Sequence, residues 1–129
     1  MSDRLAIIMT SGTREKLQMA AMTAAVAAAG GSEVLVFVSM NALLAFRRDQ
    51  APEAPPEGEV GRLLASKGAP RPTDLFRQAV ELGSVKVFPC SMAMDVLALA
   101  PEALLDYLDK PTGLTKFLSE LGAYPTLTF

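Results

Sequence analysis

The chain lacks histidine and tryptophan, and it has one cysteine among its 129 residues. Without histidine, Cys–His and Ser–His catalytic pairs, HExxH zinc sites and mixed Cys/His metal sites are excluded. A single cysteine excludes a disulfide within the chain and a dithiol redox cycle, and it is typical of a reducing compartment. We therefore expect no metal site and no cofactor.

Charge and long apolar runs are also scarce. Charged residues make up 20% of the chain, and 12 basic and 14 acidic side chains give a net charge of −2. With no basic run, nucleic acid is not an expected partner. No stretch is long enough for a membrane span, and the alanine-rich segment 19–29 follows polar residues, unlike the apolar block of a signal peptide. These patterns favour a cytoplasmic protein.

Half of the residues are hydrophobic, and their pattern predicts an α/β fold. Apolar runs without alternation are typical of strands covered on both faces, as in parallel sheets. We expect such strands at residues 4–9, 33–40, 85–88 and 126–129. We expect helices at residues 15–29, 41–46, 74–82, 92–99, 101–108 and 112–121, with Thr73 as an N-cap. This order predicts a single domain, residues 1–129, built as a three-layer α/β/α sandwich around a mainly parallel sheet of about four to five strands.

The segment 47–72 interrupts this pattern. Five prolines punctuate charged residues, and only residues 59–66 have a helical pattern, of one or two turns. Long segments of this kind in compact domains are usually functional or mobile. We interpret residues 47–72 as a proline-rich flap.

Cys90 is the strongest functional candidate. It follows a short apolar strand and Pro89, and a helical pattern begins directly after it. The free N–H groups and the dipole at a helix N-terminus favour a thiolate, which is both a nucleophile and a sulfur acceptor. The alternative is a buried cysteine that fills the core as a small apolar side chain.

Other polar residues follow the predicted strands at their carboxyl ends. Ser11 and Gly12 follow the first strand. Asn41 follows the second, whose last two residues are Ser39 and Met40. Because the carboxyl ends of parallel strands share one edge, we expect these residues to meet Cys90 at one rim. The loop of Ser11 and Gly12 lacks the GxGxxG and P-loop patterns, which argues against nucleotide binding. Next to Cys90, we expect Ser91 and the amides of Met92 and Ala93 to donate hydrogen bonds to an anion on the sulfur.

These segments together resemble the DsrE/DsrF-like family of sulfur-relay proteins, specifically its small, single-domain, peroxiredoxin-like branch. The sharpest match is the cysteine followed by small and methionine residues and then aspartate, here residues 90–97. Other matches are residues 5–8 with Ser11 and Gly12, and residues 33–37, 82–83, 113–118 and 126–129. Two positions depart from the family pattern. Ser39-Met40-Asn41 replaces an aromatic, glycine-rich stretch, and Ala98 or Leu99 stands where glycine is common.

The resemblance implies a parallel five-stranded sheet, a homo-oligomer that is a trimer or hexamer, and a cysteine that carries sulfane sulfur as a persulfide. The chain would then be sulfurtransferase-like, with sulfur donor and acceptor proteins or low-molecular-weight thiols as partners. The alternative is a non-catalytic oligomeric subunit that binds a small ligand or acts as an accessory subunit, with a structural Cys90. A thiol peroxidase is a third possibility, although no arginine near Cys90 in the sequence is placed to activate peroxide.

Overall fold

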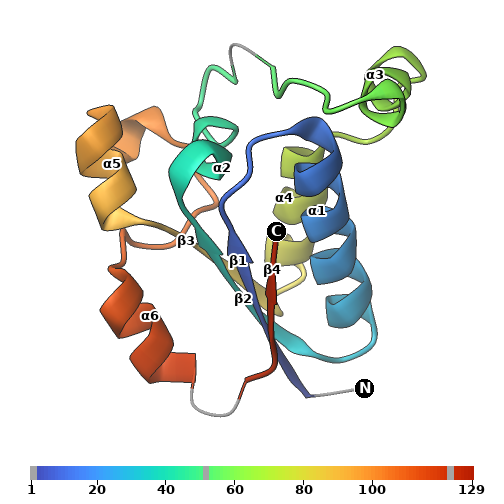
Figure 1. Cartoon of the computed structure of the whole chain (residues 1–129). Helices are drawn as coiled ribbons and strands as arrows, with labels where there is room; N and C mark the ends of the chain where they lie inside the picture. The colour runs from blue at the N-terminus through green and yellow to red at the C-terminus, as the bar shows by residue number, and fades with distance from the viewer. Residues whose placement is uncertain (1–2, 51–52, 122–123) are drawn as a thin grey trace.

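A computed structural model of the chain describes residues 3–50, 53–121 and 124–129. Its strands are β1 (Arg4–Met9), β2 (Glu33–Val38), β3 (Val85–Pro89) and β4 (Thr126–Thr128). Its helices are α1 (Arg14–Ala29), α2 (Met40–Leu44), α3 (Glu59–Ser66), α4 (Pro72–Glu81), α5 (Ser91–Leu97) and α6 (Leu114–Leu121), with a 3-10 turn at Pro101–Ala103. Figure 1 shows these elements.

The sheet is parallel throughout and has the strand order β3-β2-β1-β4. β2 is the best-covered strand, because every residue after Glu33 in it is buried. It pairs in one continuous register with β1 and β3, so that Ile7, Val36 and Val87 lie side by side. The predicted α/β fold around a parallel sheet is confirmed.

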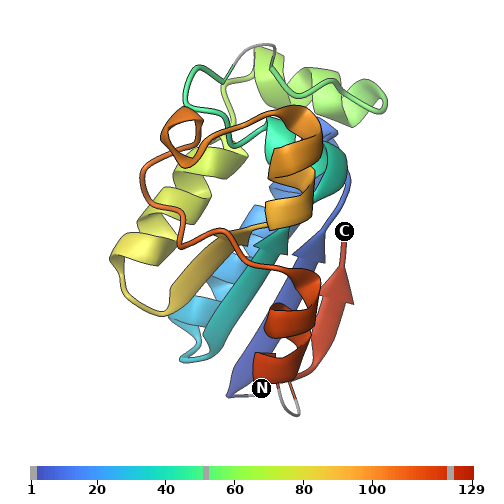
Figure 2. The same ribbon diagram turned by 90° about the vertical axis from the view of Figure 1, so that its left-hand side faces the viewer.

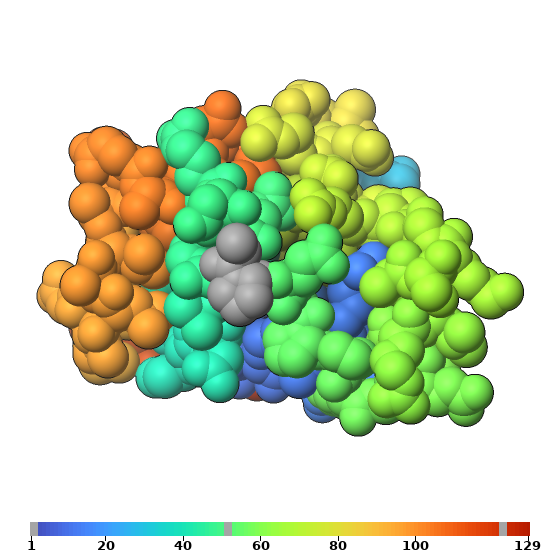
Figure 3. Space-filling model, turned by 90° about the horizontal axis from the view of Figure 1, so that it is seen from above, coloured from blue at the N-terminus to red at the C-terminus, as the bar shows by residue number. Residues whose placement is uncertain are grey.

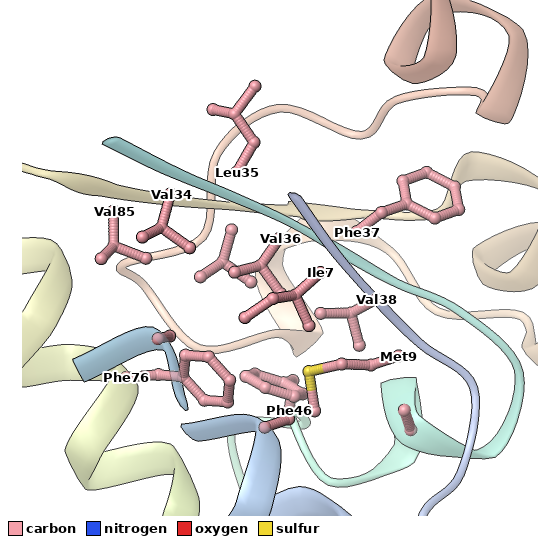
Figure 4. Close-up of a cluster of buried hydrophobic side chains, with 14 of the residues drawn as sticks. Ile7, Met9, Val34, Leu35, Val36, Phe37, Val38, Phe46, Phe76 and Val85 are labelled. Carbon is pink, nitrogen blue, oxygen red and sulfur yellow. The ribbon is translucent and has the colours of Figure 1, made fainter. Parts of the chain in front are cut away.

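Helices cover both faces of the sheet. α1 and α4 lie on one face, and α5 and α6 lie on the other (Figures 1 and 2). Along β2 the side chains alternate between these layers: Val34, Val36 and Val38 point to one side, and Leu35 and Phe37 to the other (Figure 4). On the α6 side, the ring of Phe117 lies 5.0 Å from that of Phe37 and 6.1 Å from that of Phe88.

Two sequence-based predictions of local structure are wrong. The helix expected at 101–108 is only the 3-10 turn at Pro101–Ala103, because Leu104 turns extended and pairs with Arg47 from a distant part of the chain. The N-cap of α4 is Arg71 rather than Thr73, since Pro72 takes the first helical position, where its missing N–H costs no hydrogen bond. The hydroxyl of Thr73 instead donates to Gln50.

The flap contains the predicted helix, α3, and it is fastened to the start of α1. The Glu15 carboxylate accepts hydrogen bonds from the N–H groups of Glu57, Gly58 and Gly61, at 2.8, 2.9 and 3.1 Å. These amides form the N-terminus of α3, where a negative charge is favoured. A Cβ on Gly61 would collide with this carboxylate. Glu15 thus fixes α3 against α1.

Neighbouring side chains hold the far end of the flap. Arg14 and Gln18 are buried, and they donate hydrogen bonds to the carbonyl oxygens of Ala69 and Pro70, at 3.3 and 3.1 Å. The backbone N–H of Arg14 also donates to Pro55. One turn and a half of α1 therefore binds the flap at several points along its described length.

Within the described residues, no helix combines the length and apolar character that crossing a membrane would need.

We predict that Glu15→Gln loosens the flap. Hydrogen bonds from the amides, led by that of Glu57, hold the pKa of the Glu15 carboxyl below its usual value of 4.5. Because the pKa falls on folding, the stabilisation is present above pH 4.5 and is lost as the pH falls through the lower folded-state pKa. Hydrogen exchange should show about tenfold lower protection of the α3 amides in Glu15→Gln.

The control is Glu120→Gln, which removes an exposed carboxylate from α6. It should leave flap protection unchanged. In the wild-type protein, the protection factors of the flap amides should decrease below pH 4.5, and Glu15→Gln should lack this step. Equal protection in both variants at neutral pH would contradict the role of the carboxylate.

Candidate functional site

Cys90 lies where the sequence predicts, between the end of β3 and the start of α5. It is the N-cap of α5, with extended backbone angles, and its Sγ accepts a hydrogen bond from the N–H of Ala93 at 3.4 Å. The sulfur thus takes the place that a serine or aspartate oxygen has in most caps. A negative charge on Sγ would be stabilised by the same N–H group.

The backbone around Cys90 extends the sheet beyond β3. The N–H of Cys90 donates to Val38 at 2.9 Å, which continues the pairing of β3 with β2. On the other side, Thr112 pairs with Cys90: its N–H donates to Pro89, and its carbonyl accepts from Ser91. Cys90 is therefore held between two strands rather than in a free loop.

This pairing buries the cysteine more than the sequence suggests. A thiol at a strand-to-helix rim should be only partly enclosed, but Cys90 is 3% exposed. The pairing of Thr112 covers the edge of β3, and Ala93 and Met94, which follow Cys90 in α5, are buried as well. This burial agrees with the alternative in which Cys90 fills the core. Reagents larger than a few atoms can reach Sγ only after α5 or the Thr112 segment moves.

The three residues after Cys90 differ in what they contribute. Ala93 supplies the N–H bond to Sγ. The N–H of Ser91 donates to Thr112 instead, at 3.0 Å, so that amide is not available to the sulfur. Met92 is 55% exposed and forms part of the outer surface of α5.

Gly12 and Asn41 meet, as the shared edge of the sheet predicts. A Cβ on Gly12 would lie 2.5 Å from the backbone oxygen of Asn41, a contact that only glycine avoids. The amide of Ser11 does not face a free anion site, because it and the amide of Thr10 both donate to the backbone oxygen of Phe129, at 3.3 and 2.8 Å. Phe129 thus occupies two of the amide donors that the loop would offer to a ligand.

A cavity of about 320 Å³ opens beside Gly12 and Asn41, and the flap closes one side of it. Its walls are Gly12, Thr13, Asn41, Leu44, Ala45, Arg47, Glu53, Ala54 and Pro55. Cys90 is not part of these walls. Figure 3 shows why: α2 (teal) lies between α5 (orange) and the flap (green). The sequence predicts that Gly12 and Asn41 meet Cys90 at one rim. In the structure they form two separate places, one at Cys90 and one under the flap.

A row of small polar side chains crosses the sheet at the level of Cys90. Met9, Val38 and Pro89 are paired at the ends of β1, β2 and β3. The next residues after them are Thr10, Ser39 and Cys90. Thr112, which pairs with Cys90, continues this row. Sequence reasoning placed Ser39 near the rim but did not select it as a site residue. Once the strand order is known, Ser39 is found as the residue one register step past the end of β2, at the level of Cys90.

Comparison with known proteins identifies the family of the chain. Residues 59–124, just over half of its length, match the model of the DsrE/DsrF/DrsH-like family, and this segment includes β3, Cys90 and α5. A comparison with curated protein sequences gives no match.

Two solved structures have a similar fold. A protein of unknown function from Methanobacterium thermoautotrophicum, MTH1491, matches 99% of this chain and 100% of its own, with a TM-score of 0.68 and 11% identity. The ychN protein from E. coli matches 98% of this chain and 99% of its own, with a TM-score of 0.61 and 16% identity. At these identities, the likeness shows the fold alone.

The cap formed by Cys90 leads to a stability prediction. Cys90→Ser replaces Sγ by another acceptor for the Ala93 N–H, whereas Cys90→Ala leaves that buried N–H without a partner. We expect Cys90→Ser to be more stable than Cys90→Ala by about 1 kcal/mol, the usual value of an N-cap side chain. Urea unfolding of both variants measures the difference. If Cys90→Ala is the more stable variant, apolar packing outweighs the cap at this position.

Proposed function

Because the chain belongs to the DsrE/DsrF/DrsH-like family, we propose that it is a sulfur-relay protein that carries sulfane sulfur as a persulfide on Cys90. The observation that carries this proposal is the place of the sole thiol of the chain: the carboxyl end of β3, with Sγ accepting the Ala93 N–H. Open α/β sheets bind their ligands at this end of the strands. One thiol without a resolving cysteine suits transfer of a sulfur atom between molecules.

The proposed reaction has two balanced steps. The Cys90 thiolate attacks the outer sulfur of a donor persulfide, a new S–S bond forms, and the S–S bond of the donor breaks to release the donor thiolate. A thiolate of the acceptor then attacks the outer sulfur on Cys90, which regenerates the Cys90 thiolate. No net oxidation or reduction of the protein takes place. Donors and acceptors are persulfides and thiols of proteins or of small molecules.

The burial of Cys90 fits a carrier that shields its cargo. A persulfide that is exposed to solvent reacts with any thiol in solution, whereas a sulfur covered by α5 and the Thr112 segment reacts only when this cover opens. The same burial also favours a second candidate function, in which Cys90 is structural. In that case the protein is a non-catalytic subunit that binds a small ligand, and the cavity of about 320 Å³ under the flap is its binding site.

We predict that wild-type protein incubated with glutathione persulfide gains one sulfur atom at Cys90. Intact-mass spectrometry should show an added sulfur that a reducing thiol removes and that Cys90→Ser does not acquire. An unmodified protein, in a tube where a free small thiol becomes loaded, would favour the second candidate. Binding of a metabolite at the cavity would then be tested with Gly12→Ala, whose Cβ would clash with the backbone oxygen of Asn41 and so distort the cavity wall.

We also propose that the protein is a homo-oligomer, a trimer or hexamer. Met19, Met22 and Val26 form an apolar stripe along α1, and they are 52%, 45% and 65% exposed. β4 is the edge strand of the sheet beside β1, and its Leu127 is 44% exposed. An apolar helix face and an open sheet edge are surfaces that oligomers bury.

We predict that Val26→Glu lowers the mass in solution toward the 13.7 kDa of one chain, because it places a charge in this stripe. Light scattering measures the mass. The matched control is Val60→Glu, since Val60 is similarly exposed, at 62%, but lies on α3. A wild-type protein that is itself monomeric at micromolar concentration would contradict the proposed assembly.

A further inference from the structure

Ser39 is a buried serine whose hydroxyl forms no hydrogen bond within the described residues. The residue is 4% exposed, and its backbone is fully used: its N–H donates to Met9, and its carbonyl accepts from Ala42. The side chain does not cap α2, although Ser39 is its N-cap residue. In the part of the chain that the structure describes, the hydroxyl forms no hydrogen bond. A hydroxyl that has no protein partner in a residue only 4% exposed calls for an explanation.

The other polar side chains of the row are all occupied. The hydroxyl of Thr10 donates to Phe129 at 3.3 Å, and the hydroxyl of Thr112 donates to Lys110 at 2.8 Å. The sulfur of Cys90 accepts from Ala93. Within the described chain, Ser39 is the one member of this row whose side chain forms no hydrogen bond.

The backbone points Ser39 and Cys90 toward the same side of the sheet. Val38 faces α1 and α4, and it pairs with Pro89. Ser39 and Cys90 directly follow β2 and β3, and both have extended backbone angles. Successive side chains of extended strands alternate between faces, so both side chains point toward α5 and α6. Their backbones are neighbours in adjacent strands, about 4.8 Å apart.

The Ser39 hydroxyl is not fully enclosed. No fully enclosed side-chain oxygen among the described residues lacks a partner, so the Ser39 hydroxyl borders the small accessible surface that the residue keeps. Cys90 keeps a similarly small surface, at 3%. A sulfur atom bonded to Sγ would extend about 2 Å from it.

We propose that the Ser39 hydroxyl donates a hydrogen bond to the outer sulfur of a Cys90 persulfide. This inference rests on the proposed sulfur-relay function and names its cargo. The stored group is a lone sulfane sulfur, held as an anion. A mixed disulfide with a bulky thiol does not fit while α5 covers the site. Ser39 is thus a positioning residue for the cargo and does not take part in bond making.

The test measures how strongly each variant holds sulfur. Wild-type protein and Ser39→Ala are equilibrated with a fixed ratio of glutathione persulfide to glutathione, and intact-mass spectrometry gives the loaded fraction. A hydrogen bond to an anionic sulfur is charge-assisted, so its loss should lower the loading equilibrium constant by about tenfold. Thermal melting of the unloaded proteins should change little, because the hydroxyl has no partner in the unloaded fold.

A second pair of variants separates the hydroxyl from packing. Ser39→Thr and Ser39→Val have the same size and differ only in the hydroxyl, so any strain from the added carbon atoms is common to both. Ser39→Thr should hold sulfur about tenfold more strongly than Ser39→Val. This comparison remains valid if Ser39→Ala folds poorly. Thr73→Val, which removes a buried hydroxyl far from Cys90, is the control and should load like the wild type.

The outcomes distinguish the two proposals. If wild-type protein loads and Ser39→Ala and Ser39→Val load equally well, the role of Ser39 is overturned and the relay function stands. If glutathione itself is found as a stable mixed disulfide on Cys90 in the wild type, the single-sulfur cargo is overturned. If wild-type protein does not load at all, the relay function fails, and the role of Ser39 fails with it.

Discussion

The parallel pairing of β2 with both β1 and β3 is the constraint on which the rest of the molecule depends. β2 is buried on both faces, so a shift of its register by one residue would turn Val36 and Phe37 toward the wrong helical layers. The same register carries Ser39 to the level of Cys90 and lets the Cys90 N–H bond to Val38. The place of the thiol is thus a result of core packing, and the chemistry proposed for it relies on groups that the core aligns.

Much of the fold follows from local patterns. β1 and α3 have the predicted bounds, and β3 is one residue longer than expected, because short apolar runs and turn residues determine these elements locally. Non-local contacts explain the failures. The segment after Pro101 has a helical composition, but the pairing of Leu104 with Arg47 makes it extended. That pairing joins residues far apart in sequence, so no window of sequence reveals it.

The candidate site was predicted in part, for a related reason. The position of Cys90 before a helix can be read from the residues on either side. The separation of Cys90 from Gly12 depends on strand order, because β2 and α2 come between them. The burial of Cys90 depends on Thr112, a residue more than twenty positions later in the chain. Sequence patterns identify which strand ends carry polar residues, but the order of the strands decides which of those residues meet.

The end of α5 has a bearing on how the thiol is reached. Ala98, which follows α5, has φ 54° and ψ 43°, a left-handed conformation in which glycine is relaxed and alanine is strained by about 1 kcal/mol or more. α5 is also a short helix of seven residues with Met92 and Val96 exposed on its outer side. Short, strained elements open locally before the rest of a domain unfolds. Sulfur exchange at Cys90 would then proceed at a rate set by the fraction of molecules in which α5 is open, in the same way that amide exchange reports rare open states of a native protein.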